Sequence, residues 1–324
     1  MNTQILQFNT DNLRLAAKEI LDGGIVAFPT ETVYGLGANA LNPDAVKKIY
    51  IAKGRPSDNP LICHISDKSQ IEKFAYLTPF AEKIIDAFMP GPITVILQKK
   101  PIVPDIVTGG LQTVGIRMPA HKGALSFIKA CGVPICAPSA NTSTKPSPTA
   151  ATHVFDDLNG KIKYILDGGR CGVGLESTIV DCVNGTLLRQ GGVPKEDIER
   201  IVGTLNPPPQ SDIPLCPGMK YKHYSPNAEV LLAIPTADMR SRIAAEYDKR
   251  QGKTIILTLG GSYGNRNVCS VGSTVEEYAY NLFDCFRRLD DEGYECIICE
   301  GVDGSGVGAA LMNRLNKASG GFVL

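Results

Sequence analysis

The chain has 324 residues, and its 33 Lys plus Arg balance 33 Asp plus Glu, so its formal net charge at pH 7 is zero. This balance argues against a protein held on nucleic acid mainly by counterion release, although a local basic pocket is still compatible with it. No apolar run approaches the roughly 20 residues of a membrane helix, and residues 1–10 lack the basic start and apolar core of a signal peptide. We expect a cytoplasmic protein with two domains.

The first stretch of the chain predicts an alternation of helices and strands. A helix with one apolar face ends at Gly23-Gly24, and an apolar strand over residues 25–28 follows. Asn42 and Pro43 are typical N-cap and first-turn residues of a second helix, which places Lys53 and Arg55 just beyond its end. Further strands are expected at residues 61–65, 94–97, 114–118, 134–137, 164–166, 178–182 and 186–189.

The last two of these strands are joined by Asn184-Gly185, which is a strong hairpin signal, so the sheet should be mixed and not purely parallel. Residues 204–227 contain six prolines and little periodicity, as expected of a semi-rigid linker. The predicted limits are therefore an N-terminal α/β domain over 1–203, a linker over 204–227 and a C-terminal domain over 228–324.

The C-terminal domain shows a second α/β rhythm, which predicts a small doubly wound, Rossmann-like sheet. Its strands are expected at residues 230–234, 254–257 and 296–300, with a helix opened by Ser273 and Glu276 in capping-box spacing. The glycine-rich loop over 304–308 lacks the spacing of a Walker or dinucleotide fingerprint, and we interpret it as a packing turn.

The ten cysteines are scattered through apolar runs, so we interpret them as buried free thiols. Cys296 and Cys299 form a Cys-x-x-Cys pair, but no second pair or His pair completes a zinc set. The four histidines show no metal-ligand spacing either.

Two polar clusters suggest an anion site: Lys53-Gly54-Arg55-Pro56 and Ser139-Ala140-Asn141. Arg grips oxygens in a planar fork and Lys adds a movable charge, so two such cations facing a hydroxyl and an amide would suit a nucleotide phosphate. The alternative is a solvated helix end and an ordinary loop.

Several ordered motifs carry a resemblance to a known family. They are Pro29-Thr30-Glu31-Thr32-Val33-Tyr34-Gly35-Leu36, Lys53-Gly54-Arg55-Pro56, Asn59-Pro60-Leu61, Pro90-Gly91-Pro92-Ile93-Thr94, Val114-Gly115-Ile116-Arg117-Met118-Pro119, Pro138-Ser139-Ala140-Asn141, Ser177-Thr178-Ile179-Val180 and Pro217-Gly218-Met219-Lys220-Tyr221-Lys222-His223-Tyr224-Ser225-Pro226. With these motifs the chain resembles the two-domain form of the threonylcarbamoyl-AMP synthases, whose N-terminal domain is YrdC-like. Residues 308–318 match that family's C-terminal domain.

The resemblance implies a nucleotidyltransferase that joins L-threonine, bicarbonate and ATP into threonylcarbamoyl-AMP and releases pyrophosphate, for threonylcarbamoyladenosine modification of tRNA. It implies catalytic roles for Lys53, Arg55, Ser139 and Asn141. By position in the motifs, the threonine ligands would be Thr32, His64, Arg117, Ala137 and Ser177, and the ATP ligands would be Arg55, Asn59, Thr113, Ser139, Ser147, Arg189 and Tyr224.

Each of these residues also has a plainer interpretation. On sequence alone, His64 could be a hydrogen-bonded core histidine, Thr32 and Ser177 could be ordinary turn and strand residues, and a strand arginine such as Arg117 is usually solvated. Glu31 shows no clear role as a general base and could be a structural partner.

Lys220, Lys222, His223 and Tyr224 suggest that the linker folds back over the nucleotide as a lid; the alternative is an inert spacer. Mg²⁺ is expected to be held largely by the triphosphate, because no carboxylate cluster for it is visible. A downstream tRNA threonylcarbamoyl transferase complex is the expected partner, with weak or no direct tRNA binding and no membrane. The alternative functions are a non-catalytic RNA-binding module and a carbamoyltransferase-type enzyme of hydrogenase maturation.

Overall fold

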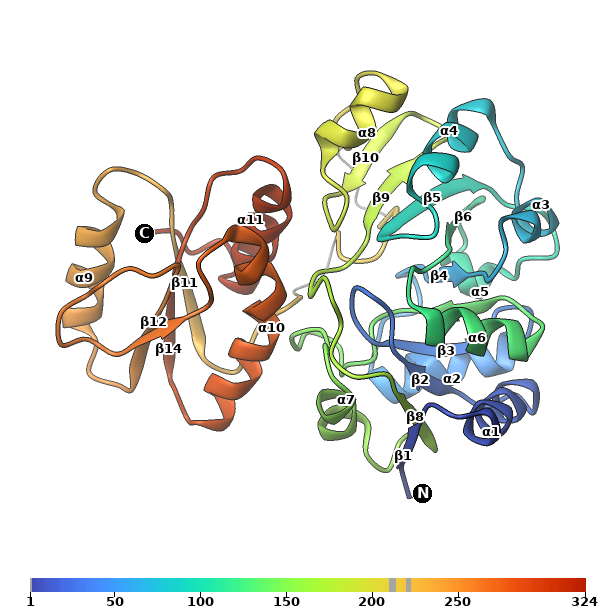
Figure 1. The fold of residues 1–324 in the computed structure, drawn as a ribbon, viewed down its shortest axis with the longest axis horizontal. Coiled ribbons are helices and arrows are strands. Elements are labelled where there is room, and N and C mark those ends of the chain that lie inside the picture. Colours follow the sequence, from blue (N-terminus) through green and yellow to red (C-terminus); the bar gives the residue numbers. More distant parts are fainter. Residues whose placement is uncertain (1, 210–213, 220–222) are drawn as a thin grey trace.

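The computed structural model describes residues 2–209, 214–219 and 223–324, which form two lobes joined by the proline-rich linker (Figure 1). The N-terminal lobe holds a ten-stranded mixed sheet in the order β1-β8-β2-β3-β7-β4-β6-β5-β9-β10. Its strands are β1 (Gln4–Gln7), β2 (Val26–Phe28), β3 (Gly35–Asn39), β4 (Ile62–His64), β5 (Ile93–Gln98), β6 (Thr113–Arg117), β7 (Ile135–Ala137), β8 (Tyr164–Asp167), β9 (Thr178–Asp181) and β10 (Thr186–Arg189).

Helices cover both faces of this sheet. α1 (Thr10–Leu21) and α6 (Lys122–Cys131) pack on one face against Val26, Phe28 and Ile135. The larger core on the other face gathers the apolar sides of the remaining helices, which are α2 (Pro43–Lys53), α3 (Ile71–Phe74) after the short 3₁₀ turn η1 (Lys68–Gln70), α4 (Pro79–Phe88), α5 (Asp105–Thr108), α7 (Ala151–Leu158) and α8 (Lys195–Val202).

The described linker residues 214–219 pack against the N-terminal sheet. Cys216 is buried against Ile62, Ile96 and Ile179, and Leu215 and Met219 pack on the same cluster. Burial of these apolar side chains stabilises the position of the linker over β4, β5 and β9. Residues 214–219 therefore lie on the sheet close to the ends of the strands that carry the predicted site.

The C-terminal lobe is a four-stranded parallel sheet in the order β11-β14-β12-β13. Its strands are β11 (Glu229–Ala233), β12 (Thr254–Thr258), β13 (Val268–Ser270) and β14 (Cys296–Glu300). Alternate strand residues point to opposite faces, so one face buries α9 (Met239–Lys249) and the other buries α10 (Val275–Asp291) and α11 (Val307–Ala318). α10 and α11 lie on the side that faces the N-terminal lobe (Figure 1).

The structure confirms the α/β class, the β9–β10 hairpin and the parallel doubly wound C-terminal sheet. Lys53 is the last residue of α2 and not beyond it, with Gly54 as the left-handed C-cap at φ 62°. The N-cap of α10 lies one residue later than predicted, and within this described segment the reciprocal bond of a capping box is not formed: Thr274 is the N-cap, and its side chain accepts from the Glu277 amide. Glu277 in turn accepts from the Ser273 amide, one residue before the cap.

All ten cysteines are free and buried, as expected. Within the described parts of the chain, none of the helices combines the length and the apolar character that crossing a membrane would require.

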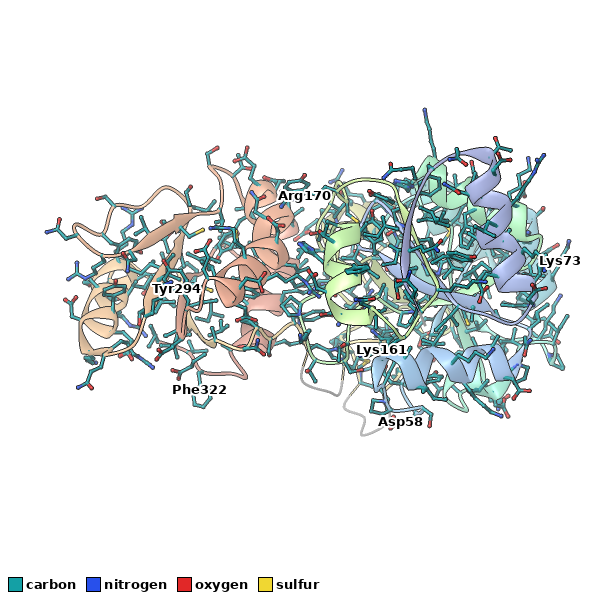
Figure 2. All side chains as sticks on the ribbon, turned by 90° about the horizontal axis from the view of Figure 1, so that it is seen from below. Asp58, Lys73, Lys161, Arg170, Tyr294 and Phe322 are labelled. Carbon is teal, nitrogen blue, oxygen red and sulfur yellow. The ribbon has the colours of Figure 1, made fainter. Side chains whose placement is uncertain are left out.

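The two lobes are held together by charged contacts from α10. Arg170 of the N-terminal lobe donates to the Asn281 side chain at 2.9 Å and stacks over the Tyr280 ring, and it lies at the junction of the lobes (Figure 2). Arg287 pairs with Asp157 at 2.8 Å, with the Asp157 side chain almost fully buried. These contacts fix α10 against the N-terminal lobe.

Candidate active site

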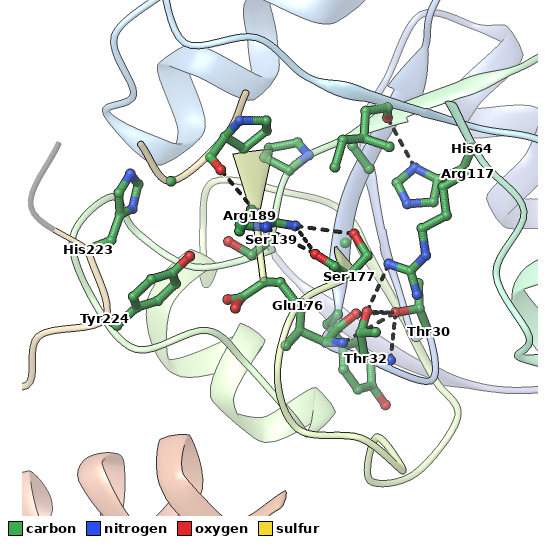
Figure 3. Close-up of a pocket in the computed structure, with 18 of the residues that line it drawn as sticks. Thr30, Thr32, His64, Arg117, Ser139, Glu176, Ser177, Arg189, His223 and Tyr224 are labelled. Carbon is green, nitrogen blue, oxygen red and sulfur yellow. Dashed lines mark hydrogen bonds between the residues drawn. The ribbon is translucent and has the colours of Figure 1, made fainter. Parts of the chain in front are cut away.

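A pocket opens where the N-terminal sheet meets the linker (Figure 3). β2, β3, β4, β6, β7, β9 and β10, or the turns next to them, contribute to its wall. The lining residues are Thr30, Thr32, Val33, Tyr34, Gly35, Arg55, Ile62, His64, Arg117, Ala137, Pro138, Ser139, Glu176, Ser177, Arg189, Pro217, Gly218, His223 and Tyr224. Three arginines against one carboxylate make this lining cationic, which favours an anionic ligand.

Arg55 reaches the pocket because α2 ends sharply at Gly54. The left-handed cap turns the chain back, and the Arg55 amide donates to Tyr50 O at 3.0 Å. The side chain is then anchored by backbone carbonyls, with Nη2 donating to Pro60 O at 3.1 Å. Burial lowers the pKa of Arg55 to about 10, so the guanidinium stays charged at neutral pH.

Lys53 lies beneath the pocket wall and does not line it. Its Nζ donates to Ser139 O at 2.6 Å and also to Asn141 O, and the Lys53 carbonyl accepts from the Ser143 amide. Burial, followed by the nearby Arg55 charge, holds the pKa of Lys53 well below its ordinary value. The two sequence clusters do meet, as predicted, but Lys53 meets the backbone of the second cluster.

The second cluster contributes Ser139 to the lining, whereas the Asn141 side chain turns toward its own loop. Asn141 Nδ2 donates to Thr142 O at 2.8 Å and to Lys145 O at 3.0 Å. Asn141 therefore lies outside the lining and shapes the loop that carries Ser139.

All five residues predicted for threonine line the pocket: Thr32, His64, Arg117, Ala137 and Ser177. Arg117 is 4% exposed, donates from Nη1 to Thr32 Oγ1 at 2.9 Å and places Nη2 2.7 Å from Glu31 Oε1. This strand arginine is thus buried and paired, not solvated, and Glu31 is its structural partner. The pair leaves the guanidinium fixed in the pocket wall.

His64 enters the pocket from β4 as a neutral imidazole. Burial, followed by the Arg117 charge, lowers its pKa to about 3, and its Nδ1 lies 3.1 Å from Ile62 O. Because a carbonyl only accepts, this contact is a hydrogen bond in the tautomer that carries its N–H on Nδ1.

Ser177 and Arg189 form a second fixed unit. Arg189 donates from Nε and Nη2 to Ser177 O at 3.1 and 2.9 Å, and Nη2 also donates to Ser177 Oγ at 3.2 Å. The remaining arm, Nη1, donates to Pro217 O of the linker at 3.1 Å. One arginine from β10 thereby ties a predicted threonine ligand to the linker (Figure 3).

Four of the residues predicted for ATP line the pocket, namely Arg55, Ser139, Arg189 and Tyr224. Thr113 lines a small neighbouring cavity that shares Ile62 and Pro217 with the pocket. Ser147 is buried one layer back and donates to Glu176 Oε1 at 2.6 Å. Asn59 is also buried outside the lining; among the described residues its Oδ1 has no hydrogen-bond partner.

The linker forms one wall of the pocket through Pro217, Gly218, His223 and Tyr224, while Lys220 and Lys222 lie outside the described residues. Tyr224 has a left-handed backbone at φ 67°, and its ring stacks on Phe283 of α10 with centroids 5.4 Å apart. Burial lowers the pKa of His223 to about 3. The Ser225 amide donates to Thr144 O at 3.0 Å, which anchors the end of the linker.

The sequence interpretation missed Glu176 as a pocket residue. It is 7% exposed and accepts from Ser147 and from Arg314, which lies 138 positions later. Its position just before the Ser177 motif was the available signal, but the partner that makes a buried carboxylate stable there could not be seen locally.

Residues 18–191 match the Sua5/YciO/YrdC family model, described as "Telomere recombination", and residues 193–320 match the model described as "Threonylcarbamoyl-AMP synthase, C-terminal domain". The second match includes α8 and the linker.

Threonylcarbamoyl-AMP synthase of Pyrococcus abyssi is 48% identical over 320 residues, covering 95% of this chain and 94% of the relative. That of Bacillus subtilis is 45% identical over 335 residues, covering 99% and 97%. The solved structure of P. abyssi Sua5 complexed with L-threonine matches with a TM-score of 0.94 at 45% identity, covering 100% of this chain and 99% of that one. Escherichia coli YciO, at 21% identity and a TM-score of 0.53, covers 58% of this chain and 96% of its own and shares the fold of the N-terminal lobe.

These matches confirm the resemblance, the YrdC-like α/β fold class and the expectation of a nucleotidyltransferase-type enzyme. Both family models and full-length relatives agree over nearly the entire chain, so the chain belongs to the threonylcarbamoyl-AMP synthase family in its two-domain form.

Proposed function

We propose that the pocket is where this chain converts L-threonine, bicarbonate and ATP into threonylcarbamoyl-AMP and pyrophosphate, for threonylcarbamoyladenosine modification of tRNA. The observation that carries the proposal is the convergence of three buried arginines, Arg55, Arg117 and Arg189, on one pocket that also holds the predicted threonine ligands. A relative whose chain this one matches throughout has been solved as a complex with L-threonine.

Threonine would bind at the Arg117 end of the pocket. Arg117 offers a fixed guanidinium to the amino acid carboxylate, with Thr32, His64, Ala137 and Ser177 around the rest of the molecule. A neutral His64 adds no charge that would repel the ammonium or amine. The triphosphate would lie toward Arg55, Ser139 and Arg189, with Tyr224 closing over it and Asn59, Thr113 and Ser147 supporting this end.

The reaction has two steps. The threonine nitrogen bonds to the carbon of bicarbonate with loss of water, which gives a carbamate. A carbamate oxygen then bonds to the α-phosphorus of ATP, the bond from that phosphorus to the bridging oxygen breaks, and pyrophosphate leaves with the electron pair. We assign the catalytic contribution to Arg55 and Arg189. Their fixed positive charges would hold the two anions together and stabilise the charge of this transition state.

Lys53 contributes by holding the loop that carries Ser139 and Asn141, since its ammonium is engaged with both of their carbonyls. This differs from direct neutralisation of the triphosphate, which was the expectation from sequence. A group that fixes a loop affects the rate through the position of Ser139.

Mg²⁺ would enter with the triphosphate. The described residues contain no cluster of three His, Cys, Asp or Glu that could hold a metal, and the pocket carboxylate, Glu176, is already bound to Arg314 and Ser147. Triphosphate oxygens and water would therefore supply most of the ligands, as Mg²⁺ commonly accepts.

The linker would act as a lid over the labile adenylate. Its described residues already contact Arg189 and line the pocket, and their apolar side chains seal one edge against the sheet. Opening of this wall would allow the product to pass to a downstream tRNA threonylcarbamoyl transferase. Ten free thiols fit a reducing compartment such as the cytoplasm.

The test is pyrophosphate release by the purified full chain with ATP and Mg²⁺, omitting L-threonine or bicarbonate in turn, with the adenylate identified by mass spectrometry. Release should need both co-substrates and fall about 10- to 100-fold in Arg55→Ala, which removes a charged hydrogen-bonding group. Arg242→Ala on the outer helix α9 is the control and should match the wild type. Folded wild-type protein that releases no pyrophosphate under any of these conditions would refute the proposal.

A further inference from the structure

Arg314 connects the C-terminal domain to the pocket. It lies on α11, is 0% exposed, and donates from Nε to Glu176 Oε2 at 2.9 Å. Its Nη1 donates to Gln190 O at 2.5 Å, and its guanidinium lies 5.5 Å from the centre of the Tyr224 ring. Arg314 is not itself among the lining residues.

Glu176 passes this contact on to the pocket. Its second carboxylate oxygen accepts from Ser147 Oγ at 2.6 Å, and its carbonyl accepts from the Gly192 amide at 3.2 Å. The next residue is Ser177, which Arg189 holds. A single buried side chain of the second domain is therefore linked to Glu176 and Tyr224, which line the pocket, and through Glu176 to Ser147.

The local structure holds α11 firmly enough for this role. Gly308 packs so closely on the preceding loop that a Cβ there would come within 2.0 Å of Asp303 O. Leu311 and Leu315 are fully buried in the C-terminal core. The helix axis, and with it the origin of the Arg314 side chain, is thus fixed relative to β14.

We propose that Arg314 is a positioning residue for the reaction: acting from the C-terminal domain, it orients Glu176 and, through it, Ser147 and the Tyr224 side of the pocket. The inference rests on the proposed function for its kinetic consequences. It gives the second domain a direct part in the active site, because a carboxylate buried without a cation would not keep this geometry.

The charge around Glu176 supplies a distinctive readout. It is faced by Arg314 and Lys317 from α11, by Arg189 from β10 and by His223 and Tyr224 from the linker. Burial alone would raise the pKa of Glu176, but Arg314, Arg189 and the Ser147 hydroxyl together hold it below its ordinary value. Without Arg314, the acid limb of the activity profile should move to higher pH.

The experiment compares Arg314→Gln, Arg314→Lys, Glu176→Gln and the double variant with Arg314→Gln. Pyrophosphate release is followed from pH 5 to 9 at varied ATP and threonine. We expect kcat/KM of Arg314→Gln to fall about 10- to 100-fold, as for loss of a charged hydrogen bond. The acid limb of its pH profile should move to higher pH, and this shift should be absent from the double variant, which has no carboxylate at position 176. Arg314→Lys should recover part of the rate, and the double variant should cost little more than either single change.

Amide hydrogen exchange provides a readout that does not depend on activity. Arg314→Gln should increase exchange in residues 144–149 and 176–178, while the control Arg170→Gln, which removes a contact between the lobes away from the pocket, should change only residues near 170 and 280. The inference would be overturned if Arg314→Gln kept the kinetics, pH profile and hydrogen exchange of the wild type. It would also be overturned if Arg170→Gln lost as much kcat/KM as Arg314→Gln. If the wild type released no pyrophosphate but Arg314→Gln still showed faster exchange in these segments, the positioning role would be supported and the proposed function rejected.

Discussion

The buried neutral imidazole of His64 makes the stability of the protein sensitive to mild acid. Its pKa is about 3 in the folded chain against 6.5 for an exposed histidine, because burial and then the Arg117 charge disfavour the charged form. Between these two values the unfolded chain binds a proton that the folded chain does not. The free energy of unfolding should therefore be unaffected by this group above pH 6.5 and fall as the pH drops below it.

The magnitude follows from the two pKa values. Protonation of the unfolded state lowers the free energy of unfolding by about 2 kcal/mol between pH 7 and pH 5, and by about 4 kcal/mol once the pH reaches 3, where the folded chain also begins to bind the proton. The window from pH 7 to 5 lies mostly above the range in which ordinary carboxylates titrate, so the histidine effect dominates there.

The assay is urea unfolding at pH 7 and at pH 5, followed by circular dichroism because the chain has no tryptophan. His64→Asn is the matched variant, since its side-chain amide can still donate to Ile62 O but does not titrate. The loss of stability between the two pH values should be about 2 kcal/mol larger in the wild type than in the variant. Equal losses in both proteins would show that His64 is protonated in the folded state and would refute the reasoning.

Three further changes test the neighbourhood of the pocket. Glu31→Gln removes the ionic partner of buried Arg117 and should lower the free energy of unfolding by about 3 kcal/mol in urea titrations; a change below about 0.5 kcal/mol would contradict a structural role for the pair. Lys53→Met keeps the side-chain volume but leaves Ser139 O and Asn141 O without their donor, so pyrophosphate release should fall at least about 10-fold while the circular dichroism spectrum is retained; unchanged release would reject the loop-holding role. Gly308→Ala should destabilise the C-terminal lobe by about 1–3 kcal/mol through overpacking, which would lower its melting temperature. The control Gly304→Ala places a Cβ that meets no atom within 4 Å and should melt like the wild type. Equal melting temperatures of the two variants would disprove the close contact.

The sequence predicted the elements whose pattern is set locally. Apolar runs located β4 to β10, and Asn42 and Pro43 located the start of α2 because capping acts over a few residues. The end of α2 was placed before Lys53, whereas the left-handed Gly54 ends the helix after it. It did not predict β1, which is short and largely exposed, or β3, whose glycines have little strand propensity. β3 forms because β2 and β7 offer hydrogen-bonding edges on both of its sides, and that is a tertiary effect.

The site was predictable where motifs mark it and not where contacts cross the domains. The motifs led to Arg55, Arg117 and Ser177, which do share one pocket. Periodicity cannot reveal that Glu176 is stabilised by Arg314, since the two residues are far apart in sequence and neither is unusual in its own segment. The motif around Gly308 to Ala318 was noticed, but its meaning required the packed domains.

The arrangement of charge explains how a chain of zero net charge can hold an anion site. Two of the three lining arginines are bound to backbone carbonyls, Arg55 to Pro60 O and Arg189 to Ser177 O and Pro217 O, whereas Arg117 is paired with Glu31. Behind the lining, Lys53 likewise donates to Ser139 O and Asn141 O. Carbonyl dipoles satisfy the donors without cancelling their charge, so the pocket stays positive. The lining carboxylate Glu176 would offset this field, but Arg314 neutralises it from the second domain. The C-terminal domain therefore helps to keep the pocket cationic as well as closed, which is a physical reason for the two domains to occur in one chain.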